Sequence, residues 1–506
     1  MIWKLSFGIL IGNLVVFYAY STSYFLNKFL KLNLSNLNKI IFGYSILAII
    51  IYFFYFWFNF KLTQIYIFFV LIFFFFLLYI KQFLINFFIT KENILLNSAI
   101  ILFLIPALFY GEQFYIFRGN YWDSSNYLSS AILFNNFEYS EIRDKLYPDL
   151  FLNFQSIDQI VRARPLANVL LAIFINREIS IFFSYYVFKV IITSLIFLSL
   201  AAFLDKHLQI KNKNFILIIS FIYIFSFWNL YVLEIDALSH YASIPILILT
   251  ISFLFDIFKK FDDKKNYILL TIASSSLFLV YPEILIILIL ISFSLILENI
   301  NKLKKNNFIY FLLSFFLFLI ITIPSLETNY KHLIHSQLSQ SFRYNDWWGY
   351  FGGFIIGSEN LILDNKFVNE FKDILKKKPD SFEIISFLHK EHFNNDYKFI
   401  YLNIIPSISG LYFLTPALIK DDFSKIFQYL FLYLIIIYLL RIIYLNSKYF
   451  LKNSITKKRT IYFILIVFIF LFYFFYNKNY WVIIKFFTYL FPFIYLFFAI
   501  NFYEKK

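Results

Sequence analysis

One acid, Asp123, stands among aromatic residues in a polar segment, residues 111–165, that interrupts a mostly apolar chain. The sequence at its centre, GNYWDSSNYLSSA, places Tyr121, Trp122 and Tyr127 within a few residues of the acid. A carboxylate can take a proton as a general base, and aromatic rings can stack on a sugar ring. This combination beside a membrane predicts a site for an anionic, sugar-like or lipid-linked ligand.

Asp123 also has a structural interpretation. An aspartate followed by Ser124 and Ser125 commonly caps the start of a helix, here predicted near residues 124–134. Capping and catalysis are compatible, because a capping acid at the membrane surface is held in place and partly desolvated. Both interpretations therefore stay open.

Other acids fall in short turns between apolar runs. Glu234 and Asp236 lie in LEIDALSHY, followed at once by His240. Glu283 directly follows Pro282 and is flanked by apolar residues. A charge near the membrane is costly unless it is used or paired, so these residues are candidates for a site. Keeping the turns soluble, or capping a helix, is the alternative role.

Five basic or aromatic residues could hold a phosphate. Arginine can bind phosphate through two parallel hydrogen bonds, which makes candidates of Arg162, Arg164 and Arg343, although a loop arginine can equally be a plain surface charge. Lys485, near the start of the last apolar run and close to Tyr489, is a further candidate. Its alternative is snorkelling, in which the ammonium reaches the interface along its own stem.

Metal and cofactor chemistry have little support in the sequence. His332 and His335 have a spacing that could place both on one metal, but no carboxylate motif accompanies them. The chain has no cysteine, which excludes disulfides, thiolate catalysis and cysteine-bound zinc. We therefore predict no metal and no cofactor.

The elements that must position these residues are membrane helices. The 506 residues are 61% hydrophobic, with a mean hydropathy of +0.72. Apolar runs of about 17 residues or more recur, long enough for a hydrocarbon core of roughly 30 Å, and they lack the alternation of a barrel strand. We predict an all-α, polytopic transmembrane helical bundle of about 11–13 spans, with two large extracytoplasmic loops that contain short helices. The first apolar segment is expected to be a retained anchor.

Charge indicates which loops share a side. The net charge of +15 comes largely from lysines in short loops between spans, which are typical of the cytoplasmic face. Residues 111–165 hold five basic and seven acidic residues, and residues 325–398 hold nine and ten, so both are predicted outside. Nucleic-acid binding is disfavoured, because no basic stripe lies on a soluble domain.

The predicted organisation has four parts. They are extra N-terminal spans at 1–92, a transmembrane core at 93–324 with the first outer loop at 111–165, an outer loop or small subdomain at 325–398, and C-terminal spans at 399–506. The first span is predicted at residues 2–20. Within the core, residues 215–233 and 308–323 are each predicted as one span, and residues 267–297 as two helices that meet at Tyr281-Pro282-Glu283.

The order of these parts resembles the GT-C superfamily of integral membrane glycosyltransferases. In that family a first outer loop carries an acid, which YWDSSNY matches with Asp123. A second acid lies in the next outer turn, matched by Glu234 or Asp236 in LEIDALSHY, and VYPEIL and the loop after Ser325 follow in the expected order. The extra N-terminal spans, and a single acid where some members carry a pair, depart from the pattern.

The resemblance implies transfer of a sugar from a polyprenyl-phosphate donor to a lipid, glycan or protein acceptor. The transfer would take place on the extracytoplasmic face of the cell (inner) membrane. Asp123 would be the base, Glu234 or Asp236 would assist, and cations would hold the leaving phosphate. The donor's prenyl chain would lie between spans. A polymerase of surface polysaccharide, and a flippase for lipid-linked glycans, are the alternatives.

Overall fold

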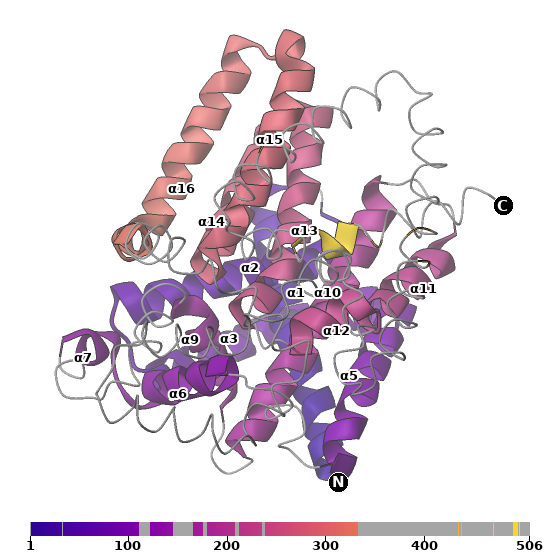
Figure 1. The fold of residues 1–506 in the computed structure, drawn as a ribbon, viewed down its shortest axis with the longest axis vertical. Helices are drawn as coiled ribbons and strands as arrows, with labels where there is room; N and C mark the ends of the chain where they lie inside the picture. The colour runs from indigo at the N-terminus through magenta and orange to yellow at the C-terminus, as the bar shows by residue number, and fades with distance from the viewer. Residues whose placement is uncertain are drawn as a thin grey trace, which may run out of the picture. The chain divides into compact units, whose positions relative to one another are not determined.

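The fold was obtained as a computed structural model of the whole chain. It describes residues 2–32, 34–110, 122–144, 165–175, 180–207, 212–234 and 238–331, and in addition residues 434, 437, 469, 489–493 and 495. The chain divides into two compact units, Met1–His332 and Leu333–Lys506. Every described regular element is a helix, which confirms the predicted all-α class (Figure 1).

Nearly all described helices belong to the first unit. They are α1 (Ile2–Leu30), α2 (Asn36–Tyr52), α3 (Leu62–Phe76), α4 (Ile80–Phe83), α5 (Lys91–Tyr110), α6 (Trp122–Asn136), α7 (Tyr139–Asp144), α9 (Pro165–Phe174), α10 (Ile181–His207), α11 (Lys213–Ile224), α12 (Phe227–Glu234), α13 (Leu238–Lys259), α14 (Lys264–Val280), α15 (Leu285–Asn299) and α16 (Lys305–Lys331). Short π or 3₁₀ turns extend α2, join α3 to α4, and begin α15.

Six helical stretches in the described part are long and apolar enough to cross a membrane, so the protein is a multi-pass membrane protein. They are Trp3–Leu30, Asn36–Trp57, Leu62–Phe88, Ile181–His207, Leu238–Lys259 and Lys305–Ile323.

Helices α10 and α13 form the centre of the first unit. They pack against each other, and α2, α5, α9, α11 and α14 surround them. Helices α3 and α16 instead expose large apolar side chains, among them Leu71 and Phe74 on α3 and Phe308 and Phe316 on α16. Apolar side chains that face outward along a spanning helix are suited to lipid. The bundle therefore has a buried core of two helices and a rim that is compatible with a bilayer.

Basic loops lie together at one end of this unit. Helices α1 and α5 run antiparallel, because Gly8 and Gly12 of α1 face Leu104 and Ile100 of α5 in turn. The last residues of α1 therefore lie at the same end as Lys91, which begins α5. We call this end, which holds Lys31, Lys91 and Lys265, the basic end.

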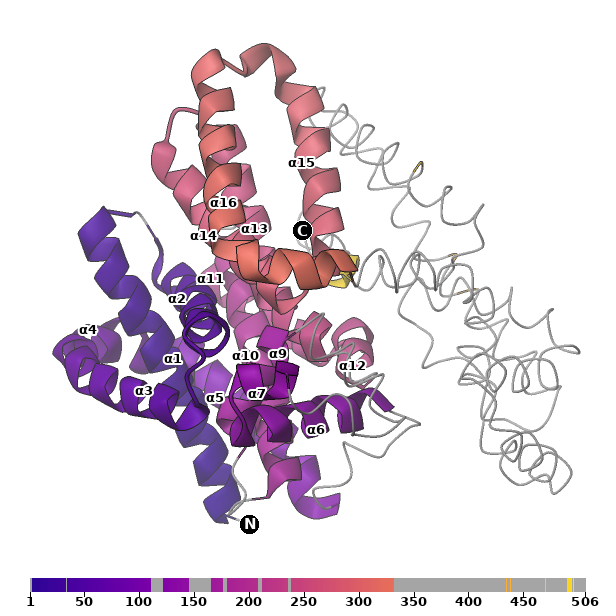
Figure 2. The same cartoon turned by 90° about the vertical axis from the view of Figure 1, so that its left-hand side faces the viewer.

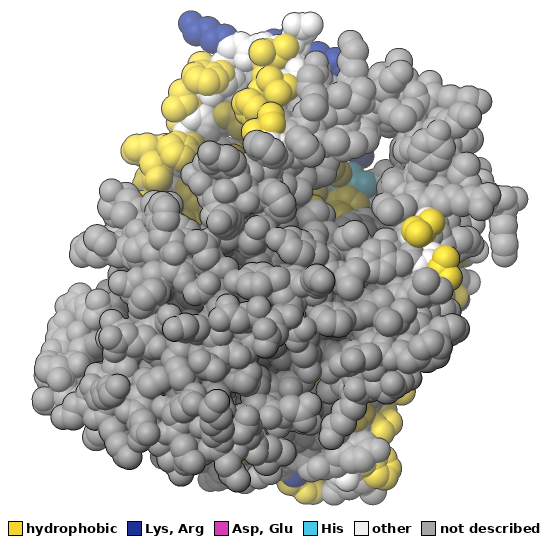
Figure 3. Space-filling view, viewed as in Figure 1, with side chains coloured by type: hydrophobic (Ala, Val, Ile, Leu, Met, Phe, Trp, Pro, Cys, Tyr) yellow, Lys and Arg dark blue, Asp and Glu magenta, His cyan; other side chains and the backbone are white. Residues whose placement is uncertain are grey.

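Hydrogen bonds join the loops of the basic end. The Lys265 ammonium donates to the backbone oxygen of Lys31 at 2.7 Å, and the Lys91 ammonium donates to the Asn214 side-chain oxygen at 3.1 Å. At the tip of α15 and α16, lysine side chains cap the apolar surface of the two helices (Figure 3). Loops that the sequence predicts to share one side thus lie at one end of the bundle.

The opposite end carries the connection between α2 and α3. Asn59 in this connection donates to Glu138 Oε2 at 2.9 Å and to Ser140 Oγ at 2.7 Å, and it accepts from the Ser140 backbone N–H at 2.8 Å. Lys61 lies 3.6 Å from Glu138. We call this end, with Asn59, Glu138 and Ser140, the site end, because it also holds the predicted site segments.

Two helix boundaries differ from the sequence prediction. The predicted span at 215–233 is two helices, α11 and α12, which meet at Phe225 and Ser226. Helix α16 does not end near Ile323 but continues to Lys331, with Pro324 inside it. Figure 2 shows its last part running across the other helices, as expected where proline kinks a helix. The predicted break at Tyr281-Pro282-Glu283 is confirmed.

Candidate functional site

Helices α6, α7 and α9 form the described part of the segment at 111–165 and its continuation, and α6 packs on α9. Asn135 near the end of α6 donates to the backbone oxygens of Ala172 and Ile175, at 3.4 and 3.3 Å. Tyr66 of α3 donates to the backbone oxygen of Ile173 at 2.7 Å. These side chains satisfy carbonyls that the end of α9 leaves without helical partners. Helix α6 is therefore fixed to the membrane helices through α9 and α3.

A hydrogen bond connects α6 to the start of α13. Ser239 Oγ donates to the Tyr127 hydroxyl at 3.1 Å, and both residues are buried. Tyr127 belongs to the polar segment and Ser239 to LEIDALSHY, so the two predicted site segments are in contact. Position 123 lies one turn before Tyr127 on the same side of α6.

A third segment joins at the break between α14 and α15. The His240 ring stacks on the Tyr281 ring, with centroids 5.7 Å apart and planes inclined by 4°. Both rings are buried, and the half-buried Glu283 follows two residues later. The cluster of Tyr127, Ser239, His240 and Tyr281 thus unites three segments that the sequence predicts on one face. We call these four residues the site-end cluster.

A buried polar chain links the site-end cluster to α10. The Tyr241 hydroxyl is 2.7 Å from Thr193 Oγ1 of α10, and the Asn229 side-chain amide donates to the same hydroxyl at 3.1 Å. Asn229 also donates to the backbone oxygen of Ile224 at 2.9 Å. These bonds fix the positions of α10, α12 and α13 relative to one another. The backbone at His240 is therefore held, through the adjacent Tyr241, by Thr193 of α10 and by Asn229 of α12.

Lys189 is a functional candidate that was not singled out from the sequence. It is buried in α10, eight residues after the helix begins at the site end, which is about 12 Å along the axis at 1.5 Å per residue. It lies one turn from Thr193, whose hydroxyl donates to the Lys189 backbone oxygen, and its ammonium is 5.3 Å from the Tyr185 ring centroid. The available signal was a lone charge within IFFSYYVFKVIITSLIF.

The predicted acids are located only in part. Helix α6 begins at Trp122, so Asp123 is the second residue of the helix and not the residue before it, as the predicted cap required. Glu234 is the last residue of α12. The structure describes the backbone of Trp122, Asp123 and Glu234. The remaining predicted site residues in the first unit, Tyr121, Arg162, Arg164 and Asp236, lie outside the described residues.

The second unit is described at few positions. Tyr489 lies in a helical stretch of that unit, whereas Arg343 and Lys485 fall outside the described residues. His332 and His335 do so as well, and among the residues that the structure describes no three histidine or acidic side chains are close enough to hold a metal ion.

Comparison with known proteins adds no relative. No protein-family model, curated protein or solved structure matches the chain. A function must therefore be argued from the site itself.

Proposed function

We propose that this protein is a membrane glycosyltransferase that moves a sugar from a polyprenyl-phosphate donor to an acceptor at the site end, on the extracytoplasmic face. The observation that carries the proposal is the hydrogen bond between Tyr127 and Ser239. It joins the segment that contains Asp123 to the turn that contains Glu234 and Asp236. A transferase of this class needs its acids near one another beside the membrane, because its donor is anchored in lipid.

The chemistry is a displacement at the anomeric carbon. A carboxylate, for which Asp123 is the candidate, takes the proton of the acceptor hydroxyl. The acceptor oxygen then forms a bond to the anomeric carbon, while the bond from that carbon to the phosphate oxygen breaks. The phosphate leaves with the electron pair and with added negative charge, which a nearby cation stabilises. Aromatic residues such as Trp122 and Tyr127 would hold the sugar ring.

Lys189 adds a cation to the candidates for this phosphate. It lies one turn from Thr193, which contacts Tyr241 next to His240 in the chain. A charged residue inside a membrane helix is costly and usually marks a functional site. We therefore add Lys189 to the predicted ligands of the donor phosphate, which are Arg162, Arg164, Arg343 and Lys485.

The proposal is tested by mass spectrometry of lipid-linked sugars and surface glycans from cells with and without the protein. We expect that cells without it accumulate a polyprenyl-phosphate monosaccharide and lose one sugar from a glycan. Loss of long polymer with accumulation of a lipid-linked oligosaccharide would instead identify a polymerase. Unchanged glycans and lipid-linked sugars would refute the transferase.

A further inference from the structure

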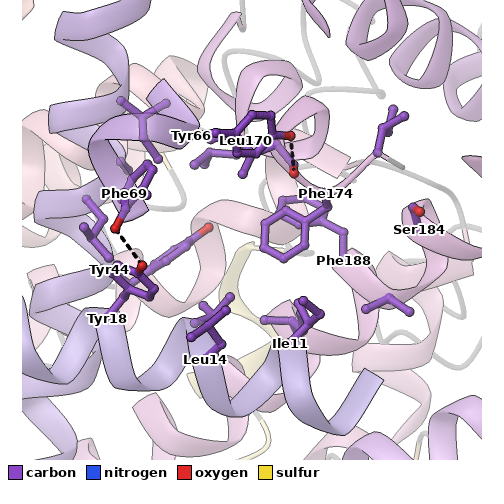
Figure 4. A pocket seen from close by; sticks show the side chains of 18 of the residues that line it. Ile11, Leu14, Tyr18, Tyr44, Tyr66, Phe69, Leu170, Phe174, Ser184 and Phe188 are labelled. Carbon is purple, nitrogen blue, oxygen red and sulfur yellow. Dashed lines mark hydrogen bonds between the residues drawn. The ribbon is translucent and has the colours of Figure 1, made fainter. Parts of the chain in front are cut away.

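A cavity of about 760 Å³ lies between α1, α2, α3, α9 and α10, with Asn135 and Asn136 at the end of α6 also in its lining. Its volume falls within the roughly 300–1,000 Å³ of ligand pockets. Figure 4 shows side chains from these helices, among them Leu14, Phe69, Leu170 and Phe188, around a shared space. Most of the described lining is aliphatic or aromatic, and none of these lining residues carries a charge.

The cavity is separate from the site-end cluster. Helix α10 faces it with Ser184, Val187, Phe188, Ile191 and Ile192, which recur at helical spacing on one side. Lys189 and Thr193 belong to a different side of the same helix, the one that meets Tyr241 of α13. Helix α10 therefore lies between this cavity and the residues Lys189 and Thr193. Helix α6 reaches the cavity with Asn135 and Asn136, at the end of the helix far from Asp123.

Three tyrosines line the cavity, and two of their hydroxyls are hydrogen-bonded to the backbone while the third is not. Tyr18 donates to the backbone oxygen of Phe69 at 2.8 Å, and Tyr66 donates to that of Ile173 at 2.7 Å. Tyr44 is 5% exposed, and its hydroxyl has no hydrogen-bond partner among the described residues. Figure 4 shows its side chain directed from α2 toward the middle of the cavity. Because a buried hydroxyl normally has a partner, this one calls for an acceptor from a ligand.

Physical chemistry limits the occupant. Protein interiors contain few voids larger than a water molecule, and each water needs two to four polar partners. The polar side chains of the lining are Tyr18, Tyr44, Tyr66, Asn135, Asn136 and Ser184, and the rest of the lining is apolar, so water would lack partners over most of the cavity. One wall, α3, exposes its other side with Leu71 and Phe74, so the bilayer lies one helix away. The occupant must be apolar and uncharged and must offer an oxygen acceptor. A prenyl chain is hydrocarbon up to its phosphate, and a phosphate would require cations in the lining.

We infer that the cavity between α1, α2, α3, α9 and α10 binds a fatty-acyl chain of a membrane lipid, whose ester carbonyl accepts a hydrogen bond from Tyr44. The acyl chain packs against the aliphatic and aromatic walls, and the carbonyl satisfies the buried hydroxyl. The bound lipid is a second ligand, distinct from the donor of the proposed reaction, and its binding does not depend on transferase activity.

The test uses purified protein in nanodiscs of phosphatidylcholine that carries a photoactivatable diazirine in one ester-linked acyl chain. Peptide mass spectrometry should find the label on the lining segments of α1 and α10. Leu14→Trp fills the cavity and should reduce this labelling at least fivefold, and Ile11→Phe is a milder variant should Leu14→Trp not fold. Leu71→Trp, on the exposed side of α3, is the matched control and should label like the parent.

Tyr44→Phe isolates the hydrogen bond. It removes only the hydroxyl, and one hydrogen bond corresponds to a roughly two- to tenfold change in affinity. Unlabelled ester lipid should therefore compete two- to tenfold less well in Tyr44→Phe than in the parent. An ether-linked lipid, which lacks the carbonyl, should compete equally weakly in both proteins. Equal competition by ester and ether lipids in the parent would refute the carbonyl contact.

Two results would overturn the site as a whole. The first is labelling of α1 and α10 that Leu14→Trp and Ile11→Phe leave unchanged, because the label would then come from the outer surface. The second is competition by polyprenyl phosphate without competition by acyl lipid, which would assign the cavity to an isoprenoid.

Discussion

Lys189 is a single buried charge inside a membrane helix. It is buried in α10, in a stretch that is otherwise without charge from Ile181 to Leu204. Its ammonium lies over the Tyr185 ring, an arrangement that favours a cation. A charge inside a membrane helix is costly, and it usually marks a functional site.

Lys189→Met should therefore separate function from stability. We expect the Michaelis constant for the lipid donor to rise at least tenfold, because the cation at the donor phosphate is lost. Thermal unfolding in detergent should change by only about 1–2 kcal/mol in either direction. Lys189→Arg keeps the charge and should retain part of the activity. Donor kinetics that stay at the parent values in Lys189→Met would remove this residue from the site.

Asp123→Asn tests the proposed base. Loss of a general base typically lowers the rate about 10²–10⁴-fold, so transfer should nearly cease. Asp123 is the second residue of α6, where an acid favours the helix dipole by only about 0.3–1 kcal/mol. Expression and thermal stability should therefore change little. The readout is sugar transfer per folded molecule.

Glu141→Gln provides the matched control for Asp123→Asn. Glu141 belongs to the same polar segment, and its carboxylate accepts the backbone N–H of Glu138 at 3.0 Å, a local structural bond. The glutamine variant should transfer sugar at close to the parent rate. If Asp123→Asn also stays near that rate, Asp123 is structural and the base lies elsewhere.

At the scale of elements, Gly43 sets the contact between α1 and α2. A side-chain carbon built on Gly43 would lie 1.7 Å from the backbone oxygen of Ala19, so the two helices can meet here only without it. Small residues commonly allow such close approach of membrane helices. Gly43 also precedes Tyr44, so this contact helps to shape the cavity wall.

Gly43→Ala should destabilise the fold by about 1–3 kcal/mol or more, because α1 and α2 must move apart. Thermal unfolding of the purified protein in detergent measures the effect. Gly12→Ala is the matched control, since its added carbon would meet only the tip of the Ile100 side chain, which can rotate away. Equal losses of stability in both variants would contradict a special role for the α1–α2 contact.

A break between two helices could be predicted from the sequence where a residue at the break ends a helix by its own geometry. The break at 281–283 was predicted because Pro282 ends a helix by its own geometry. The break at Phe225 and Ser226 was not, because neither residue is proline or glycine. It depends on Ser226, which donates to the Tyr223 backbone oxygen at 2.6 Å, and on Asn229, which donates to that of Ile224. Such bonds form only once the chain has already turned.

The opposite error occurred in α1, where the predicted span of residues 2–20 ended too early. The polar residues after Tyr20 suggested the end of the helix, but Thr22 donates to the backbone oxygen of Tyr18 and the helix runs on to Leu30. The free-energy cost of burying a hydroxyl is small when the hydroxyl donates to a carbonyl of its own helix.

The site was predictable as a set of segments rather than as a set of contacts. Aromatic and acidic composition identified Tyr127, His240 and Glu283 as candidates. Pairing Tyr127 with Ser239, and His240 with Tyr281, required the crossing of α6 and α13 and the position of α14. Lys189 was not predicted, because a single lysine within an apolar run has no motif around it that marks a site.

At the scale of the whole molecule, the first unit has two ends of different chemistry. Lysines join loops at the basic end, whereas the site end carries the cluster of Tyr127, Ser239, His240 and Tyr281. Basic loops are typical of the cytoplasmic face. The proposed reaction would then occur on the side of the membrane away from the basic loops, where a donor anchored in the lipid can reach the site end.

Cysteine labelling tests this orientation, because the chain contains no cysteine of its own. Phe58 is 59% exposed at the site end, next to Asn59, and Lys302 is exposed at the basic end, between α15 and α16. Phe58→Cys should react with a membrane-impermeant maleimide in intact cells or spheroplasts, whereas Lys302→Cys should react only after the membrane is made permeable. The cysteine-free parent is the background control. The reverse pattern would place the site end in the cytoplasm, and labelling of both variants in intact cells would show that the two ends do not lie on opposite sides of a membrane.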